Sequence, residues 1–154
     1  MDIVLDTTDL IGLDSNIIVY ALDDRYAEKQ KIARHCILKS LRSSRLVLSP
    51  QAITETYQVF IRKMGHQLPN VAQTYLSALL DVVSAPIDAD IIRSAWRIEA
   101  TARVQWWDAM MIAHAVENGC KYLLTEDMQD GFQCGDLMLC NPFHPGRIAL
   151  IDQL

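Results

Sequence analysis

Short apolar runs alternate along the chain with longer segments in which apolar residues recur at helical spacing. The short runs predict strands and the longer segments predict helices. The strands expected end at Asp14 or span Arg45–Ser49, Asp81–Ala85, Lys121–Thr125 and Leu137–Cys140. The helices expected cover Ile17–Leu22, Arg25–Ser43, Pro50–Met64, Asn70–Leu80, Asp88–Arg103 and the segment from Asp108 to Val116. We expect loops at Gly65–Pro69 and Met128–Gly135 and a loose tail after Phe143.

This alternation favours an α/β fold, with a mainly parallel sheet of about five strands and helices on both faces. The length of 154 residues favours one domain over 1–154, with its core at about 10–143 between a short N-terminal extension and a C-terminal tail. No apolar run is long enough to span a membrane, and the acidic N-terminus lacks the features of a signal peptide. The four cysteines are scattered among apolar neighbours, which predicts reduced core residues of a cytoplasmic protein.

Two acidic residues flank the most apolar helix–strand unit of the chain. Asp108 precedes the apolar segment Ala109–Val116 and is expected to cap that helix, while Asp127 follows the strand that ends at Thr125. A helix followed by a strand that runs back brings both acids to one edge of the sheet. Ligands bind at the carboxyl ends of parallel strands, so this edge is a candidate divalent-metal site.

Two further acids are candidates for the same edge. Asp14 follows a short apolar strand and precedes Ser15, Asn16 and an apolar helix. These three residue types also cap helices well, so a simple capping turn is an equal alternative. Asp6 ends a similar run and is the alternative first acid, in the N-terminal extension. Glu55 lies within a helix that follows a strand, although a Glu beside an apolar stripe is more often only exposed.

Clustered carboxylates repel one another unless a cation joins them, and oxygen ligands suit Mg²⁺ or Mn²⁺. Such ions activate water and stabilise phosphoryl transition states. The motifs of P-loop nucleotide binding, zinc proteases, serine hydrolases and dinucleotide binding are absent. The net charge of −5 argues weakly against a large nucleic-acid footprint, because a carboxylate site adds negative charge of its own.

These segments together resemble the PIN domain family. The first is Leu13–Ala21, with an acid followed by a hydroxyl residue and Asn. Glu55 falls where the second acid is expected, Trp107-Asp108-Ala109 resembles the third-acid segment, and Leu123–Asp127 resembles the fourth. Asn141-Pro142-Phe143 is similar to the end of the last strand in bacterial members. Each motif is short, but all five occur in the right order between Leu10 and Phe143.

The resemblance implies a three-layer α/β/α sandwich and a metal-dependent ribonuclease of the VapC toxin type. Asp14 and Asp108 would be the principal ligands of Mg²⁺ or Mn²⁺, with Glu55 and Asp127 completing the acidic pocket directly or through water. Ser15 and Asn16 would orient Asp14, and Thr125 would support Asp127. The implied partners are an RNA substrate, a small antitoxin protein and a second copy of the chain in a homodimer.

Several alternatives stay open at this point. Glu126 and Asp130 flank Asp127, so either could be the fourth acid. The fold could serve for binding nucleic acid or protein with little catalysis, or the protein could be another Mg²⁺-dependent phosphoryl-transfer hydrolase. A haloacid-type phosphatase would need an acid where Asn16 stands, and a receiver domain would need an adjacent acidic pair after the first strand.

Overall fold

A computed structural model describes residues 5–64, 69–82 and 85–154 of the chain. Its centre is one five-stranded sheet in the order β2-β1-β3-β5-β4, in which only β4 pairs antiparallel with its neighbour. The strands are β1 (Leu10–Leu13), β2 (Leu46–Val47), β3 (Cys120–Leu124), β4 (Gln133–Cys134) and β5 (Leu137–Cys140). The predicted α/β fold with a mainly parallel five-stranded sheet is confirmed.

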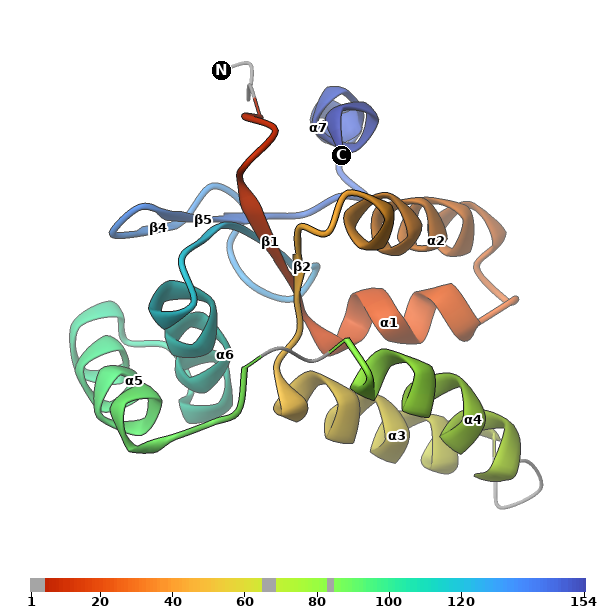
Figure 1. Cartoon of the computed structure of the whole chain (residues 1–154), viewed down its shortest axis with the longest axis horizontal. Helices are drawn as coiled ribbons and strands as arrows, with labels where there is room; N and C mark the ends of the chain where they lie inside the picture. Colours follow the sequence, from red (N-terminus) through yellow and green to blue (C-terminus); the bar gives the residue numbers. More distant parts are fainter. Residues whose placement is uncertain (1–4, 65–68, 83–84) are drawn as a thin grey trace.

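Helices cover both faces of this sheet. Figure 1 shows α1 and α2 together on one side of β1 and β2, and α5 and α6 together on the other, while α3 and α4 pair beyond the carboxyl ends of these strands. The helices are α1 (Ser15–Leu22), α2 (Ala27–Arg42), α3 (Pro50–Met64), α4 (Pro69–Leu80), α5 (Ala89–Ala102), α6 (Trp106–Glu117) and the terminal α7 (Ile148–Gln153). The expected three-layer arrangement is therefore present.

The membership of the sheet differs from the prediction at one strand. The segment Asp81–Ala85 was expected to form a strand, but Asp81 and Val82 form a turn and Ala85 is not extended in the sheet; residues 83–84 lie outside the described residues. The fifth strand is instead β4, within the predicted loop Met128–Gly135. β4 pairs antiparallel with β5 through a tight connection containing Gly135 at φ +59°, a conformation that suits glycine.

Three helices differ from the expected segments. α1 begins at Ser15, two residues before the predicted start, because Asp14 itself is the N-cap. α6 begins at Trp106, so Asp108 lies in its first turn and the expected cap at Asp108 is wrong. The tail after Phe143 is not loose, because it contains α7, whose Leu150 and Ile151 are buried. Residues 65–68 of the predicted loop Gly65–Pro69 lie outside the described residues, and Pro69 is the first residue of α4.

The core lies between the sheet and its two helical layers. β3 is buried at every position except Lys121, as expected for a parallel strand covered on both faces. Gly12 of β1 permits a close approach, because a Cβ at this residue would lie 3.1 Å from Leu123 Cδ1. All four cysteines are free, as predicted, and Cys36, Cys120 and Cys140 are buried. Within the described ranges, none of the helices has the length and apolar character needed to cross a bilayer.

Candidate active site

The candidate site lies where β1 and β3 end side by side. These strands are parallel, and after a register shift between Leu10 and Ile11 their pairing places Leu13 opposite Leu124. The β1–β3 ladder continues one residue further, because the Asp14 N–H donates to the Leu124 carbonyl at 2.9 Å. On the other side of β3, the Thr125 N–H donates to the Cys140 carbonyl of β5 at 2.9 Å. The residues that follow the two strands, Asp14 and Thr125, are therefore neighbours although 111 positions separate them.

Asp14 is buried at this edge and accepts hydrogen bonds on both carboxylate oxygens. Its Oδ1 accepts from the Ser15 N–H at 2.6 Å, which caps α1. Its Oδ2 accepts from Thr125 Oγ1 at 2.7 Å and from Asn16 Nδ2 at 3.1 Å. Asp14 is thus both the residue that caps α1 and the acid that follows β1. The capping turn and the candidate metal ligand, the two alternatives for Asp14-Ser15-Asn16, therefore do not exclude each other.

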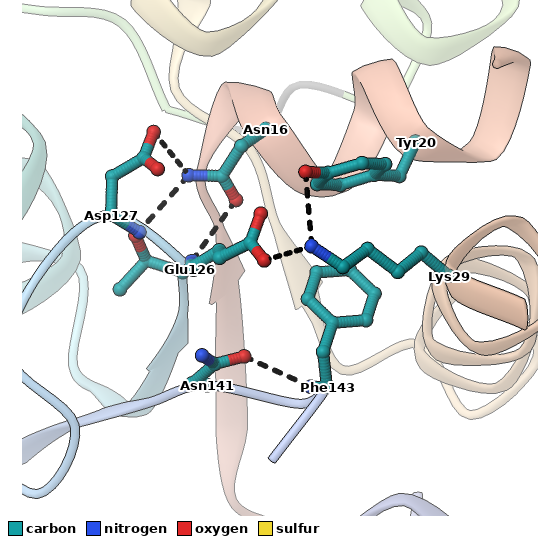
Figure 2. Close-up of polar contacts among 8 residues, drawn as sticks. Asn16, Tyr20, Lys29, Glu126, Asp127, Asn141 and Phe143 are labelled. Atoms are coloured by element: carbon teal, nitrogen blue, oxygen red, sulfur yellow. Dashed lines mark hydrogen bonds and ion pairs between the residues drawn. The ribbon is translucent and has the colours of Figure 1, made fainter. Parts of the chain in front are cut away.

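Asn16 connects Asp14 to the segment that follows β3. Its Nδ2 lies 3.2 Å from Asp127 Oδ2, and its Oδ1 accepts from the Glu126 N–H at 3.2 Å, as Figure 2 shows. The Asp127 N–H in turn donates to Thr125 Oγ1 at 3.3 Å. The supporting residues Asn16 and Thr125 therefore hold Asp127, an exposed residue, beside buried Asp14.

Glu55 comes to the same place from α3. Its Oε2 accepts from Ser15 Oγ at 3.1 Å, and its Oε1 accepts from Gln51 Nε2 at 2.7 Å. Gln51 Nε2 also donates to the Trp107 carbonyl at 3.0 Å, which ties α3 to the start of α6. Gln51 was not predicted as a site residue. Its position four residues before Glu55, one helical turn away, is the sequence signal that could have identified it.

Asp108 is half-buried in the first turn of α6. Among the described residues it has no hydrogen-bond or ion-pair partner, unlike the other three predicted acids. Its surroundings raise its pKa, first by burial and then by repulsion from Glu55 and Asp127. The fold therefore brings all four predicted acids into one electrostatic environment.

Asp14 shows the same effect more strongly. Burial is the largest cause and raises its pKa from 3.8 to about 6, with added repulsion from Glu55 and Asp127. The hydrogen bonds from Thr125 and Ser15 oppose this rise. A carboxylate that resists ionisation despite several donors is one that a cation would stabilise.

Glu126 has a different environment from Asp127, its neighbour in the sequence. Lys29 of α2 forms an ion pair with it, and Lys29 Nζ donates to Tyr20 OH at 3.1 Å (Figure 2). The same ammonium lies 4.6 Å from the Tyr20 ring centroid and 5.3 Å from that of Phe143. Burial would raise the pKa of Glu126, but the hydrogen bonds from Lys29 and Tyr20 lower it overall. Lys29 and Tyr20 were not identified from the sequence, because residues in separate helices meet only through the fold.

The other two alternative acids are also accounted for. Asp130 accepts two hydrogen bonds from Arg147, at 2.8 and 3.2 Å, and one from the Asn141 N–H at 2.8 Å. Asp6 accepts from the Thr8 N–H in an exposed turn before β1, at the opposite end of that strand from Asp14. Neither residue contacts the acids described above.

The donor set suits a hard divalent cation held partly through water. In the described parts of the chain, no three His, Cys, Asp or Glu side chains are grouped so that they could hold one metal ion together. Mg²⁺ commonly keeps several waters and binds through one or two carboxylates. Asp14 and Asp108 fit that requirement, because both have raised pKa values and neither forms an ion pair with a described residue.

Three solved structures share this fold. VapC20 of Mycobacterium tuberculosis, described as a sarcin–ricin loop cleaving toxin, is 19% identical with a TM-score of 0.55, covering 76% of this chain and 89% of its own. VapBC2 from Rickettsia felis, bound to a DNA fragment from its promoter, is 15% identical with a TM-score of 0.62, covering 84% and 96%. FitAcB from Neisseria gonorrhoeae is 20% identical with a TM-score of 0.64, covering 88% and 99%.

No curated protein sequence matches the chain significantly. The profile of the PIN domain family, however, matches residues 11–130, from β1 to the segment beyond Asp127. This range contains all four predicted acids and the residues that hold them. The chain therefore belongs to the PIN domain family.

Proposed function

We propose that the protein is a Mg²⁺- or Mn²⁺-dependent endoribonuclease that acts as the toxin of a toxin–antitoxin pair. The observation that carries the proposal is the gathering of four carboxylates, Asp14 and Asp127 after β1 and β3, Glu55 on α3 and Asp108 on α6, among which the pKa values of Asp14 and Asp108 are raised. Membership in the PIN domain family and the fold shared with VapC and FitAcB structures support the same conclusion.

In this mechanism Asp14 and Asp108 would hold the metal ion, and Glu55 and Asp127 would complete the acidic pocket, directly or through water. The bound ion would supply an activated water and stabilise negative charge on the phosphodiester. Thr125, Ser15 and Asn16 orient the Asp14 carboxylate through the hydrogen bonds described above, so that it need not reorganise when the ion arrives. Glu55 is oriented in the same way by Ser15 and Gln51.

The test is cleavage of single-stranded and structured RNA by the purified protein in Mn²⁺, Mg²⁺ or EDTA, compared with Asp108→Asn. Asp108 makes no hydrogen bond in the described structure, so its replacement by the isosteric amide should leave the fold intact. Metal-dependent cleavage that is lost in a folded Asp108→Asn protein is expected. Equal activity in EDTA or in the variant would refute the mechanism, and the absence of both cleavage and metal binding would favour a binding module.

The partners are part of the proposal. Two of the similar structures are described as VapBC2 and FitAcB, which makes a small antitoxin the expected partner of this chain. We also expect a homodimer, as is usual in the family. Light scattering of the purified protein measures the homodimer, and co-expression with any small protein encoded beside it measures the second association. A monomer, or a neighbouring small protein that does not co-purify, would contradict the respective expectation.

A further inference from the structure

The segment that carries Asp127 has no regular secondary structure. Residues 126–128 form a bend that follows the end of β3, and Asp127 itself is exposed. Among the described residues, two hydrogen bonds hold Asp127: its Oδ2 accepts from Asn16 Nδ2 at 3.2 Å, and its N–H donates to Thr125 Oγ1 at 3.3 Å. Both distances are at the long end of the range for N–H donors. These two bonds alone are a weak support for an acid that must stay beside the buried Asp14.

Glu126, the preceding residue, is held at both its backbone and its side chain. Its N–H donates to Asn16 Oδ1 at 3.2 Å, and its carboxylate forms an ion pair with Lys29 of α2. Figure 2 shows Glu126 extended toward Lys29, whereas the Asp127 side chain points away from that lysine. Because a planar peptide group joins the two residues, a Glu126 fixed at both places leaves Asp127 few directions.

Lys29 is itself fixed by aromatic residues from two other parts of the chain. Its Nζ donates to Tyr20 OH at 3.1 Å and lies 4.6 Å from the Tyr20 ring centroid and 5.3 Å from that of Phe143. The two rings meet edge to face, with their centroids 5.1 Å apart. The Lys29 side chain is 34% exposed and that of Glu126 is 22% exposed, so water screens this pair less than an ordinary surface pair. Lys29 is therefore a defined anchor for Glu126.

We propose that Lys29 is a positioning residue of the candidate active site, which holds Asp127 beside the other carboxylates by pairing with Glu126. Asn16 and Tyr20 are four residues apart and lie on one face of α1. This face binds the Glu126 backbone through Asn16 and supports, through Tyr20, the cation that binds its side chain. The inference rests on the proposed nuclease function, to which it adds a residue that acts on the geometry of the site.

A purely electrostatic effect of Lys29 would have the opposite sign. A positive charge near four carboxylates repels a divalent cation, so removing it in Lys29→Met would strengthen Mn²⁺ binding if the geometry did not change. Loss of the anchor instead weakens Mn²⁺ binding, because Asp127 no longer stays at the acidic pocket. A direct contact of Lys29 with an RNA phosphate would not weaken Mn²⁺ binding measured without RNA. The direction of the change in Mn²⁺ affinity therefore identifies the role of Lys29.

The experiment combines ¹⁵N relaxation of the metal-free protein with calorimetry of Mn²⁺ binding in the absence of RNA. In Lys29→Met, the backbone order parameters of Glu126 and Asp127 should fall from about 0.85 toward 0.6, while those of β3 stay unchanged. The Mn²⁺ affinity should fall by about tenfold, the lower end of the range for residues that orient metal ligands. At a limiting Mn²⁺ concentration, RNA cleavage should fall by the same factor.

Lys31→Met is the matched control. Lys31 is exposed on the same helix and, in the described parts of the chain, forms no ion pair, so this variant should leave the order parameters and the Mn²⁺ affinity unchanged. Lys29→Arg keeps a cation that can pair with Glu126 and should retain most of both. Glu126→Gln should weaken Mn²⁺ binding, and adding Lys29→Met to it should cause little further loss, because both changes remove one contact. Unchanged order parameters in Lys29→Met, or a Mn²⁺ affinity equal to or above that of the wild type, would overturn the proposal.

The wild-type protein separates this inference from the proposed function. If it cleaves RNA with Mn²⁺ and Lys29→Met matches it in Mn²⁺ affinity and in rigidity at Asp127, the nuclease function stands and the positioning role fails. If it neither cleaves RNA nor binds Mn²⁺, but Lys29→Met loosens Glu126 and Asp127 alone, the nuclease function fails and the positioning of Asp127 by Lys29 stands.

Discussion

The raised pKa of Asp14 predicts that the metal-free protein gains stability when this carboxylate is made neutral. Its pKa of about 6 in the folded protein, against an ordinary value of 3.8, means that folding favours the protonated form. The stability that the protonated Asp14 carboxyl contributes to the folded state is fully present below pH 3.8 and is lost as the pH rises through about 6. At about 1.4 kcal/mol per tenfold change in proton affinity, the loss by pH 7.5 is at most about 3 kcal/mol.

Asp14→Asn removes the charge but retains the shape of the side chain. The asparagine carbonyl can still accept from the Ser15 N–H, but its amide would face two donors, the Thr125 hydroxyl and the Asn16 amide, which both donate to Asp14 Oδ2 in the wild type. We subtract about 1–2 kcal/mol for this mismatch. In EDTA at pH 7.5 the variant should therefore be more stable than the wild type by about 1–2 kcal/mol, or about 3–6 °C in Tm.

Thermal and urea unfolding between pH 4 and 7.5 measure the effect. The stability advantage of Asp14→Asn should shrink on acidification and reverse near pH 4, where the wild-type carboxyl is already protonated. Asp152→Asn, an exposed change in α7, is the matched control and should follow the wild type at every pH. A difference between Asp14→Asn and wild type that does not depend on pH would refute the reasoning.

Three further predictions concern the supports of the site and the core. Millimolar Mn²⁺ should raise the Tm of the wild type at pH 7.5 by mass action, and this shift should be absent in Asp108→Asn; an equal shift in both would place the ion elsewhere. Lys29→Met should cost about 1 kcal/mol in urea unfolding, because it leaves the partly buried Glu126 carboxylate without its cation, whereas Arg93→Gln, which breaks an exposed pair, should cost less than about 0.5 kcal/mol. Gly12→Ala should cost about 1–3 kcal/mol, since its Cβ would lie 3.1 Å from Leu123 Cδ1, and an unchanged urea midpoint would show that Leu123 can move aside.

Two features could be predicted from local patterns in the sequence: the fold class and the meeting of acidic residues at one edge of the sheet. Alternating apolar runs and helical segments indicated the parallel sheet, and strand ends in such a sheet meet at one edge. That rule is sufficient to place Asp14 and Asp127 at the same edge. The local rules failed where a strand needs a partner to form. β4 exists because β5 pairs with it, whereas Asp81, Val82 and Ala85, the described residues of the predicted strand, lie outside the sheet.

The different environments of the neighbouring acids are set only by the tertiary structure. In the sequence, Glu126, Asp127 and Asp130 are equivalent carboxylates after one strand. In the fold, Lys29 pairs with Glu126 and Arg147 with Asp130, whereas Asp127 faces Asn16 and raises the pKa values of Asp14 and Asp108. The sequence by itself determined which residue types reach this edge of the sheet. Which of them remain without a cation depends on side chains from distant helices, whose positions only the packed chain defines.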